Sequence, residues 1–105
     1  MAVVTTTGRR TGEPRPVAVG FIEDPVSGGV LVAATEEAAA WTLNLDADPR
    51  ARVELGDRIF AAVAERLDIA EHRAVVRDLI LKYGTPSEGL GRGPSYRLRP
   101  VEATA

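Results

Sequence analysis

Residues 5–15 read TTTGRRTGEPR, and this stretch joins two extended segments near the start of the chain. Three arginines lie in it against one acidic residue, Glu13, although the chain as a whole is acidic. Glycine reaches backbone angles that other residues avoid, so Gly8 and Gly12 can turn main-chain N–H groups towards one point. The guanidinium fork of arginine matches phosphate or carboxylate oxygens. The stretch therefore predicts either an anion-binding cradle or an ordinary hairpin loop with solvated arginines.

The composition of the chain narrows the classes of protein that it can belong to. Its 105 residues suit a single domain, residues 1–105. A net charge of -2 and a pI near 5.4 give no overall field that would attract nucleic acid or an anionic membrane. With no cysteine and one histidine, His72, a zinc site of the usual His/Cys type is not expected. Since no apolar run approaches the roughly 20 residues of a membrane span and no signal peptide is evident, we expect a soluble, cytoplasmic protein.

The first half of the chain predicts three strands and then a short helix. β-branched and alternating apolar residues favour the strands, and the third, continuously apolar strand should be buried on both faces. Thr35 is expected to cap the helix, with two acidic residues in the first turn. In chain order, the expected elements are strands at residues 2–7, 15–22 and 30–34 and a helix from Thr35 to the residue before Pro49.

The second half of the chain predicts a hairpin, a longer helix and a last strand. The hairpin turns at Gly56-Asp57, where glycine in first place suits a type II′ turn. Residues 50–55 should point Ala51, Val53 and Leu55 inward, and residues 58–67 carry Ile59, Ala61 and Val63 on one face. Asp68 and Glu71 indicate a helix start, and Gly84 its end. The expected apolar stripe of this helix is Ile69, Val76, Leu79, Ile80 and Tyr83, and the last strand spans residues 95–101, with Arg97 and Arg99 solvated.

This order of elements predicts an α+β fold. Mostly antiparallel strands in three connected groups, with helices between them, favour a barrel with two helices packed outside. No internal repeat and no long linker divides the chain.

Two segments together resemble the deazaflavin-dependent nitroreductase family, whose members are similar to split-barrel flavin-binding proteins. Residues 5–15 match the family pattern TTTGR(R/K)(S/T)GxPR, and residues 41–50, WTLNLDADPR, are similar to WxLNLxANP. The resemblance runs from Val3 to about Tyr83. It implies a split β-barrel that binds reduced coenzyme F-420, a deazaflavin, and passes a hydride to a quinone, nitroaromatic or similar activated small-molecule acceptor. FMN is the alternative cofactor.

The resemblance also implies which residues contact the cofactor. Its phosphate contacts fall on Arg9, Arg10, Thr11 and Arg15, the positions that the residue chemistry already favours for an anion cradle. The catalytic candidate, by position, is Tyr83, whose hydroxyl could supply the proton that follows the hydride. The remaining expected contacts are Pro16 and Val17 along the cofactor and Trp41 and Asn44 on the first helix.

Two departures from the family pattern leave an alternative function open. Family members commonly carry ASKGG, with a basic residue, where this chain has ATEEA at residues 34–38. The tyrosine-rich stretch that usually precedes the last strand is reduced here to Tyr83. The alternative is therefore a non-catalytic split-barrel module that binds a deazaflavin, flavin or haem. Trp41 could also be a core residue, Asn44 could bind a helix end, and a homodimer could complete the pocket.

Overall fold

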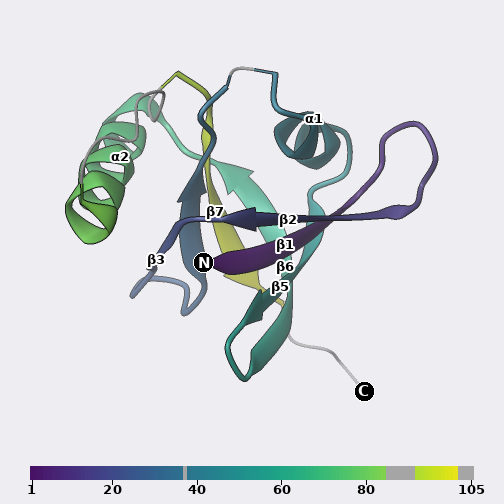
Figure 1. Cartoon of the computed structure of the whole chain (residues 1–105), viewed down its shortest axis with the longest axis horizontal. Coiled ribbons are helices and arrows are strands. Elements are labelled where there is room, and N and C mark those ends of the chain that lie inside the picture. The colour runs from purple at the N-terminus through teal and green to yellow at the C-terminus, as the bar shows by residue number, and fades with distance from the viewer. Residues whose placement is uncertain (37, 85–91, 102–105) are drawn as a thin grey trace.

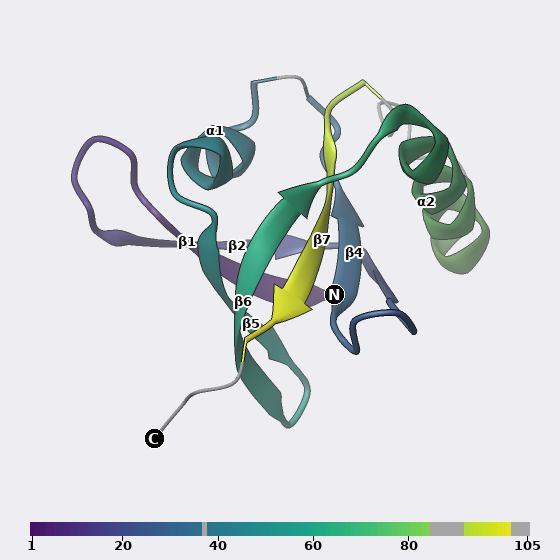
Figure 2. The same ribbon diagram turned by 180° about the vertical axis from the view of Figure 1, so that it is seen from behind.

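The computed structural model describes residues 1–36, 38–84 and 92–101. In this part of the chain, seven strands form one antiparallel sheet in the order β2-β1-β5-β6-β7-β4-β3, and two helices pack against it (Figures 1 and 2). The α+β class and the mostly antiparallel barrel are thus confirmed. The elements are β1 (Ala2–Thr7), β2 (Pro14–Val19), β3 (Phe21–Glu23), β4 (Val30–Ala33), α1 (Ala40–Ala47), β5 (Arg50–Leu55), β6 (Arg58–Arg66), α2 (Ile69–Tyr83) and β7 (Ser95–Pro100).

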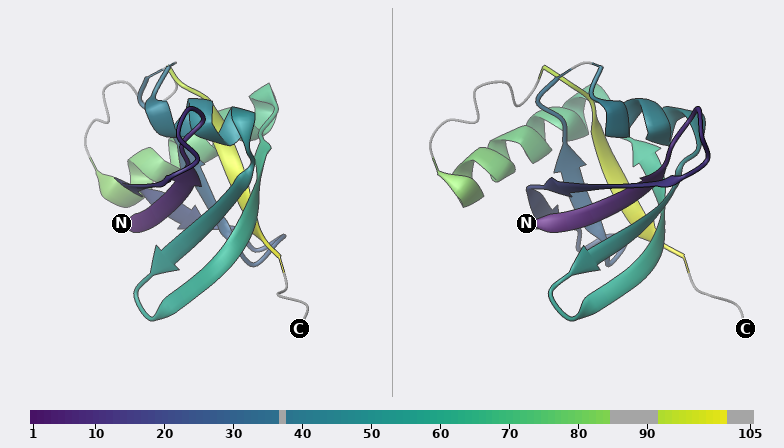
Figure 3. Two further views of the ribbon diagram at one scale, coloured as in Figure 1. Left: turned by 90° about the vertical axis from the view of Figure 1, so that its right-hand side faces the viewer. Right: turned by 45° about the vertical axis from the view of Figure 1, so that its right-hand side comes forward.

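The two edge strands of the sheet come from one continuous segment of the chain, and this requires the sheet to curl. β2 forms one edge and β3 the other, yet only Gly20 separates them in the chain. The sheet must therefore curl far enough for the end of β2 to reach the start of β3, and Figure 3 shows the curled sheet. A Cβ atom at Gly20 would lie 3.1 Å from the ring of Tyr83, so a side chain at this bend would crowd the end of α2. The prediction of one unbroken strand over residues 15–22 was wrong at this bend.

The core fills the inside of the curled sheet. The two faces of β4 pack into different clusters. Val30 and Val32 point into the barrel, whereas Leu31 and Ala33 point towards α2. All four residues of β4 are buried, as the sequence predicts. The barrel interior is lined by Ala2, Val4, Val19, Val30, Val32, Leu45, Val53, Ala62, Tyr96 and Leu98.

The two helices cover different parts of the barrel. α1 lies over one end, where Leu45 joins the core, and α2 packs on the outside against β4 (Figure 1). The predicted cap of α2 is confirmed, because the Asp68 carboxylate accepts a hydrogen bond from the Glu71 N–H at 2.9 Å. Gly84 ends the helix with φ of 79°, as predicted. In the described ranges, neither helix is both long and apolar enough to cross a membrane.

The first helix begins later than the sequence predicts. α1 starts at Ala40, its N-cap residue is Ala39, and no side chain caps it. The segment before α1 is held instead by the residues that directly precede β7. The Ala34 N–H donates to the Pro94 carbonyl at 2.9 Å, and Gly93 packs against the backbone of Glu36. These contacts outweigh the local capping signal of Thr35, whose first-turn partner Glu37 lies outside the described residues.

Two apolar faces differ from the predicted ones. Ile59 is 58% exposed, and the core side of β6 is formed by Phe60, Ala62 and Ala64. The hairpin register explains this, because Val53 pairs with Phe60 and cross-strand partners share a face. In α2, the residues buried against the sheet are Val75 and Leu79, and Ile69 and Ile80 of the predicted stripe are exposed.

Arg97 was predicted to be solvated, and this was wrong. Its side chain is 19% exposed and donates to the Asp24 carboxylate at 2.8 Å and to the Glu71 carboxylate at 2.7 Å. One guanidinium thereby ties β7, the turn after β3, and α2 together. Arg99, two residues on, pairs with Glu65 on an exposed surface, as predicted for a solvated position.

Candidate functional site

The loop between β1 and β2 has a tightly defined backbone. We call residues 8–13 the arginine loop; it projects from the barrel beside α1 (Figure 1). The Gly8 N–H donates to the Glu13 carbonyl and the Gly12 N–H to the Gly8 carbonyl, both at 2.8 Å. Gly12 has φ of 73°, a left-handed conformation that favours glycine. The Thr11 hydroxyl accepts from the Glu13 N–H at 3.3 Å, so the loop is closed by hydrogen bonds across its own base.

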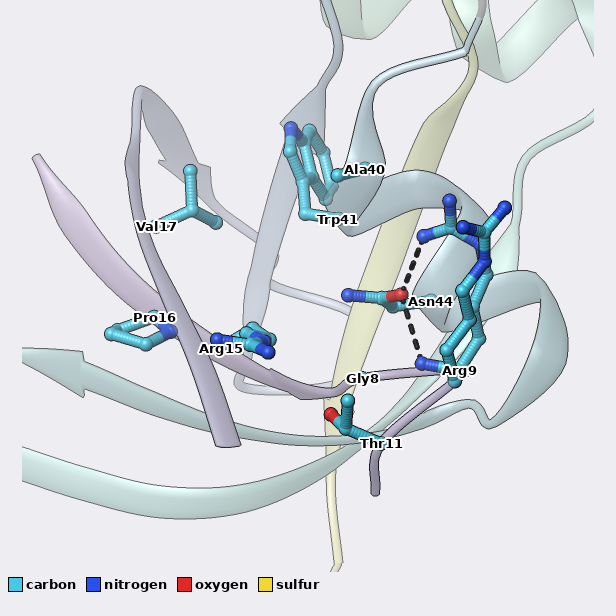
Figure 4. Close-up of a pocket in the computed structure, with 10 residues that line it drawn as sticks. Gly8, Arg9, Thr11, Arg15, Pro16, Val17, Ala40, Trp41 and Asn44 are labelled. Atoms are coloured by element: carbon cyan, nitrogen blue, oxygen red, sulfur yellow. Dashed lines mark hydrogen bonds between the residues drawn. The ribbon is translucent and has the colours of Figure 1, made fainter. Parts of the chain in front are cut away.

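Asn44 of α1 holds the arginine loop from the other side. The Asn44 side-chain oxygen accepts two hydrogen bonds from Arg9, one from the main-chain N–H at 3.2 Å and one from Nη1 at 2.9 Å (Figure 4). The Asn44 amide nitrogen donates to the Thr6 hydroxyl at 3.1 Å. Asn44 is 4% exposed and Thr6 is 2% exposed. The first helix is therefore joined to the arginine loop through a partly buried polar contact and to β1 through a buried one.

A pocket of about 410 Å³ lies between the arginine loop and α1 (Figure 4). We call it the arginine pocket, because three arginines line it and none of its described lining residues is acidic. Glu13 lies 3.6 Å from Arg15, but both side chains are more than half exposed, and such a pair contributes little. All eight residues that the sequence predicts as cofactor contacts line this one pocket, together with Gly8 and Ala40: Arg9, Arg10, Thr11, Arg15, Pro16, Val17, Trp41 and Asn44.

A second, more apolar pocket adjoins the first. We call it the apolar pocket; its volume is about 450 Å³, and it shares Val17 and Trp41 with the arginine pocket. Trp41 also packs against the core, with its ring 5.9 Å from that of Tyr96, so it serves both packing and the pockets. The apolar pocket is completed by Met1, Ala18, Val19, Gly20, Ala33, Ala34, Thr35, Leu79 and Tyr83.

Tyr83 lines the apolar pocket and not the arginine pocket. Its hydroxyl accepts from the Phe21 N–H at 3.0 Å and donates to the Phe21 carbonyl at 3.2 Å. Lys82 Nζ donates to the same carbonyl at 2.8 Å and lies 3.7 Å from the centre of the Phe21 ring. The end of α2 thus fastens the bend at Gly20, which forms one wall of the apolar pocket.

Thr6 also belongs to this site, although the sequence did not predict it. Thr6 follows Ala2 and Val4 at the inward-facing positions of β1, where an apolar residue would be expected. A hydroxyl at a buried position requires a hydrogen-bond partner, and this is the signal that could have identified it. Gly8 also lines the arginine pocket, and a Cβ atom there would lie 3.0 Å from the Thr11 hydroxyl oxygen.

Known proteins of similar structure define the class of fold. An F420-H2-dependent reductase, FDR-A, superposes with a TM-score of 0.75 at 22% identity over 90% of this chain and 90% of that chain. The heme storage protein HutZ from Vibrio cholerae gives 0.76 at 19% identity over 97% and 82%. A structure described as a domain-swapped dimer gives 0.73 at 21% identity over 90% and 76%. At these identities the similarity shows a shared split-barrel fold.

The sequence assigns the chain to a particular family, which the similarity of fold alone does not. A model of the F420H(2)-dependent quinone reductase family matches residues 1–87, which include the arginine loop, α1 and α2. The chain therefore belongs to this family, and the resemblance found in residues 5–15 and 41–50 is confirmed. The family description names F420H2 and not FMN, which leaves the FMN alternative without support.

Proposed function

We propose that the protein binds reduced coenzyme F-420 and passes its hydride to a quinone, nitroaromatic or similar activated acceptor. The observation that carries the proposal is the arginine pocket: eight family-implied contacts from two distant segments line one cavity. The cofactor's tail bears a phosphate and carboxylates, and guanidinium groups bind such oxygens well. The chemistry of the lining residues therefore fits this cofactor.

The two pockets have different proposed roles, one in binding the cofactor and the other in binding the acceptor. Arg9, Arg10, Thr11 and Arg15 hold the anionic tail, while Pro16, Val17, Trp41 and Asn44 position the rest of the cofactor. When bound, the reduced cofactor supplies the hydride, and the protein supplies binding and orientation. The apolar pocket, reached past Val17 and Trp41, takes the acceptor and keeps water away from the transfer.

Turnover tests this function directly. Under anaerobic conditions, the purified protein should oxidise reduced F-420 in the presence of menadione, followed by the return of cofactor absorbance. A matched reaction with reduced FMN is expected to be much slower, because FMN lacks the carboxylate-bearing tail. Tight binding of F-420 with no turnover of menadione or a nitroaromatic would leave a binding module and reject the reductase.

Tyr83 is assigned the proton transfer that completes reduction of the acceptor. A quinone gains a hydride and a proton to become a quinol, and the Tyr83 hydroxyl is a proton donor on the wall of the apolar pocket. Tyr83→Phe is expected to lower kcat with menadione by about 10²-fold while leaving the Kd for F-420 unchanged. An unchanged kcat would assign the hydroxyl only to its hydrogen bonds with Phe21.

Haem binding is a second candidate, favoured by the structural similarity to the heme storage protein HutZ. The single histidine argues against it, because His72 lines neither the arginine pocket nor the apolar pocket. Its Nδ1 lies instead 2.7 Å from the Ser95 hydroxyl, at the contact between α2 and β7. Titration with haem, followed by a Soret absorbance change, would support this candidate if it saturates at one equivalent and competes with F-420.

A further inference from the structure

We infer that Thr6 and Asn44 are positioning residues, which hold the arginine loop in its binding conformation before any ligand arrives. The inference rests on the proposed function of the arginine pocket, and it gives Asn44 a second role beside its proposed contact with the cofactor. It also gives a role to Thr6, which is not one of the residues that line the arginine pocket.

The hydrogen bonds of Asn44 define this part. Its side-chain oxygen receives both the main-chain N–H and the guanidinium Nη1 of Arg9. The first bond fixes where the loop leaves β1, and the second fixes where the charged end of Arg9 lies. Because the oxygen is engaged twice by Arg9, the effect of Asn44 on an anionic ligand runs through the orientation of that arginine.

Thr6 supports Asn44 and also reaches the other end of the loop. Its hydroxyl accepts from the Asn44 amide nitrogen at 3.1 Å and lies 3.5 Å from the Arg15 carbonyl, its cross-strand neighbour. The longer contact is the weaker of the two. Thr6 is thus connected to Arg9 through Asn44 and to Arg15 directly, so a single buried hydroxyl links the two sides of the arginine pocket.

The burial of these groups distinguishes positioning from ordinary packing. Valine has nearly the shape of threonine and would continue the apolar series of Ala2 and Val4 on β1. A hydroxyl and a carboxamide at almost fully buried positions are stable only if they are hydrogen-bonded, and here their partners belong to the arginine loop or to each other. A loop that is already ordered loses less conformational freedom when its ligand binds.

Limited proteolysis of the ligand-free protein tests the inference without any cofactor. Trypsin cleaves after arginine except before proline, so the Arg15–Pro16 bond resists it and cleavage in the loop reports on the bonds after Arg9 and Arg10. Thr6→Val should raise the rate of cleavage at these two bonds about five- to thirtyfold, because loss of the buried contacts lets the loop open.

Two further variants separate positioning from a general loss of structure. Thr5→Val makes the same chemical change on the opposite face of β1 and should leave the cleavage rate unchanged. Thr6→Ser keeps the hydroxyl and should remain protected. Asn44→Ala, measured alongside, should show the same exposure as Thr6→Val. A folded Thr6→Val or Asn44→Ala protein that is cleaved at the wild-type rate would overturn the inference.

Cofactor binding separates this inference from the proposed function. Thr6→Val should raise the Kd for F-420 about five- to thirtyfold, measured by fluorescence titration, because ordering the loop then opposes binding. Wild-type protein that fails to bind F-420 would reject the proposed function, while the proteolysis result would still decide the roles of Thr6 and Asn44. Equal cleavage and equal affinity in wild type and Thr6→Val would reject the inference alone.

Discussion

Replacing Arg10 and Arg15 together by alanine should weaken F-420 binding by about 2–4 kcal/mol, roughly 30- to 1,000-fold. Both arginines line the arginine pocket. Arg9 is left in place because its guanidinium is hydrogen-bonded to Asn44, so replacing it would also disturb the loop. Each should make a charge-assisted hydrogen bond to the phosphate or a carboxylate of the cofactor tail. Isothermal titration calorimetry or cofactor fluorescence would measure the change in Kd.

A matched pair of arginines on α2 provides the control. Arg73→Ala with Arg77→Ala removes the same two charges from exposed positions that line neither the arginine pocket nor the apolar pocket. This control should bind F-420 with nearly wild-type affinity at physiological salt, where distant exposed charges are screened. An equal loss in both double variants would mean that net charge, and not the arginine pocket, governs binding.

Arg97→Met should lower the free energy of unfolding by about 3 kcal/mol, the largest stability effect expected of a single charged residue here. The substitution leaves the Asp24 carboxylate, which is 2% exposed, without its guanidinium partner. Arg99→Met breaks an exposed ion pair with Glu65 and should cost about 1 kcal/mol or less. Urea unfolding followed by the fluorescence of the single tryptophan, Trp41, measures both variants.

The same network predicts how stability depends on pH. Burial alone would raise the pKa of Asp24, but hydrogen bonds from Ser27, from the Val26 N–H and from Arg97, with the charge of Arg97, lower it below the ordinary value of 3.8. A lowered carboxyl pKa contributes stability that is present above pH 3.8 and is lost as the pH falls through the folded-state pKa. Asp24→Asn should therefore be less stable than wild type near neutral pH, and the difference should shrink below about pH 4. A difference that stays constant from pH 7 to pH 3 would contradict this assignment.

Helix ends and tight turns could be predicted from the sequence, because they depend on residues that are close together in the chain. The Asp68 cap, the Gly84 end and the Gly56-Asp57 turn each depend on a few adjacent residues, and the structure has all three. The turn also determines the face of β6: with Val53 inward, a two-residue turn places Phe60 opposite it and hence inward. The apolar face expected for β6 differs from the observed one because the face is set by pairing with β5 and not by the β6 sequence alone.

Long-range contacts explain the remaining differences. The start of α1 depends on Gly93 and Pro94, which are more than fifty residues away in the chain. The burial of Arg97 depends on Asp24 and Glu71, whose positions follow from the strand order. Neither set of contacts has a signature in the local pattern of apolar and polar residues.

In the candidate site, too, some features follow from local sequence and others from long-range contacts. The motif of residues 5–15 identified the arginines, and the family resemblance joined them to Trp41 and Asn44, which the structure brings to one pocket. The apolar pocket could not be predicted in the same way, because β2, β4, α1 and α2 each contribute walls to it. The contact of Thr6 with Asn44 likewise required the position of α1 over the barrel end.

The arginine pocket is proposed to bind the anionic tail of a deazaflavin. The most direct test is to titrate the wild-type protein with F-420 and, separately, with its riboflavin-like deazaflavin precursor, which lacks the phosphate and carboxylates. Fluorescence should show saturable binding of F-420 at one equivalent, with affinity about 100-fold or more above that of the tail-less precursor. Equal affinity for the two compounds, or no binding of F-420, would contradict the claim.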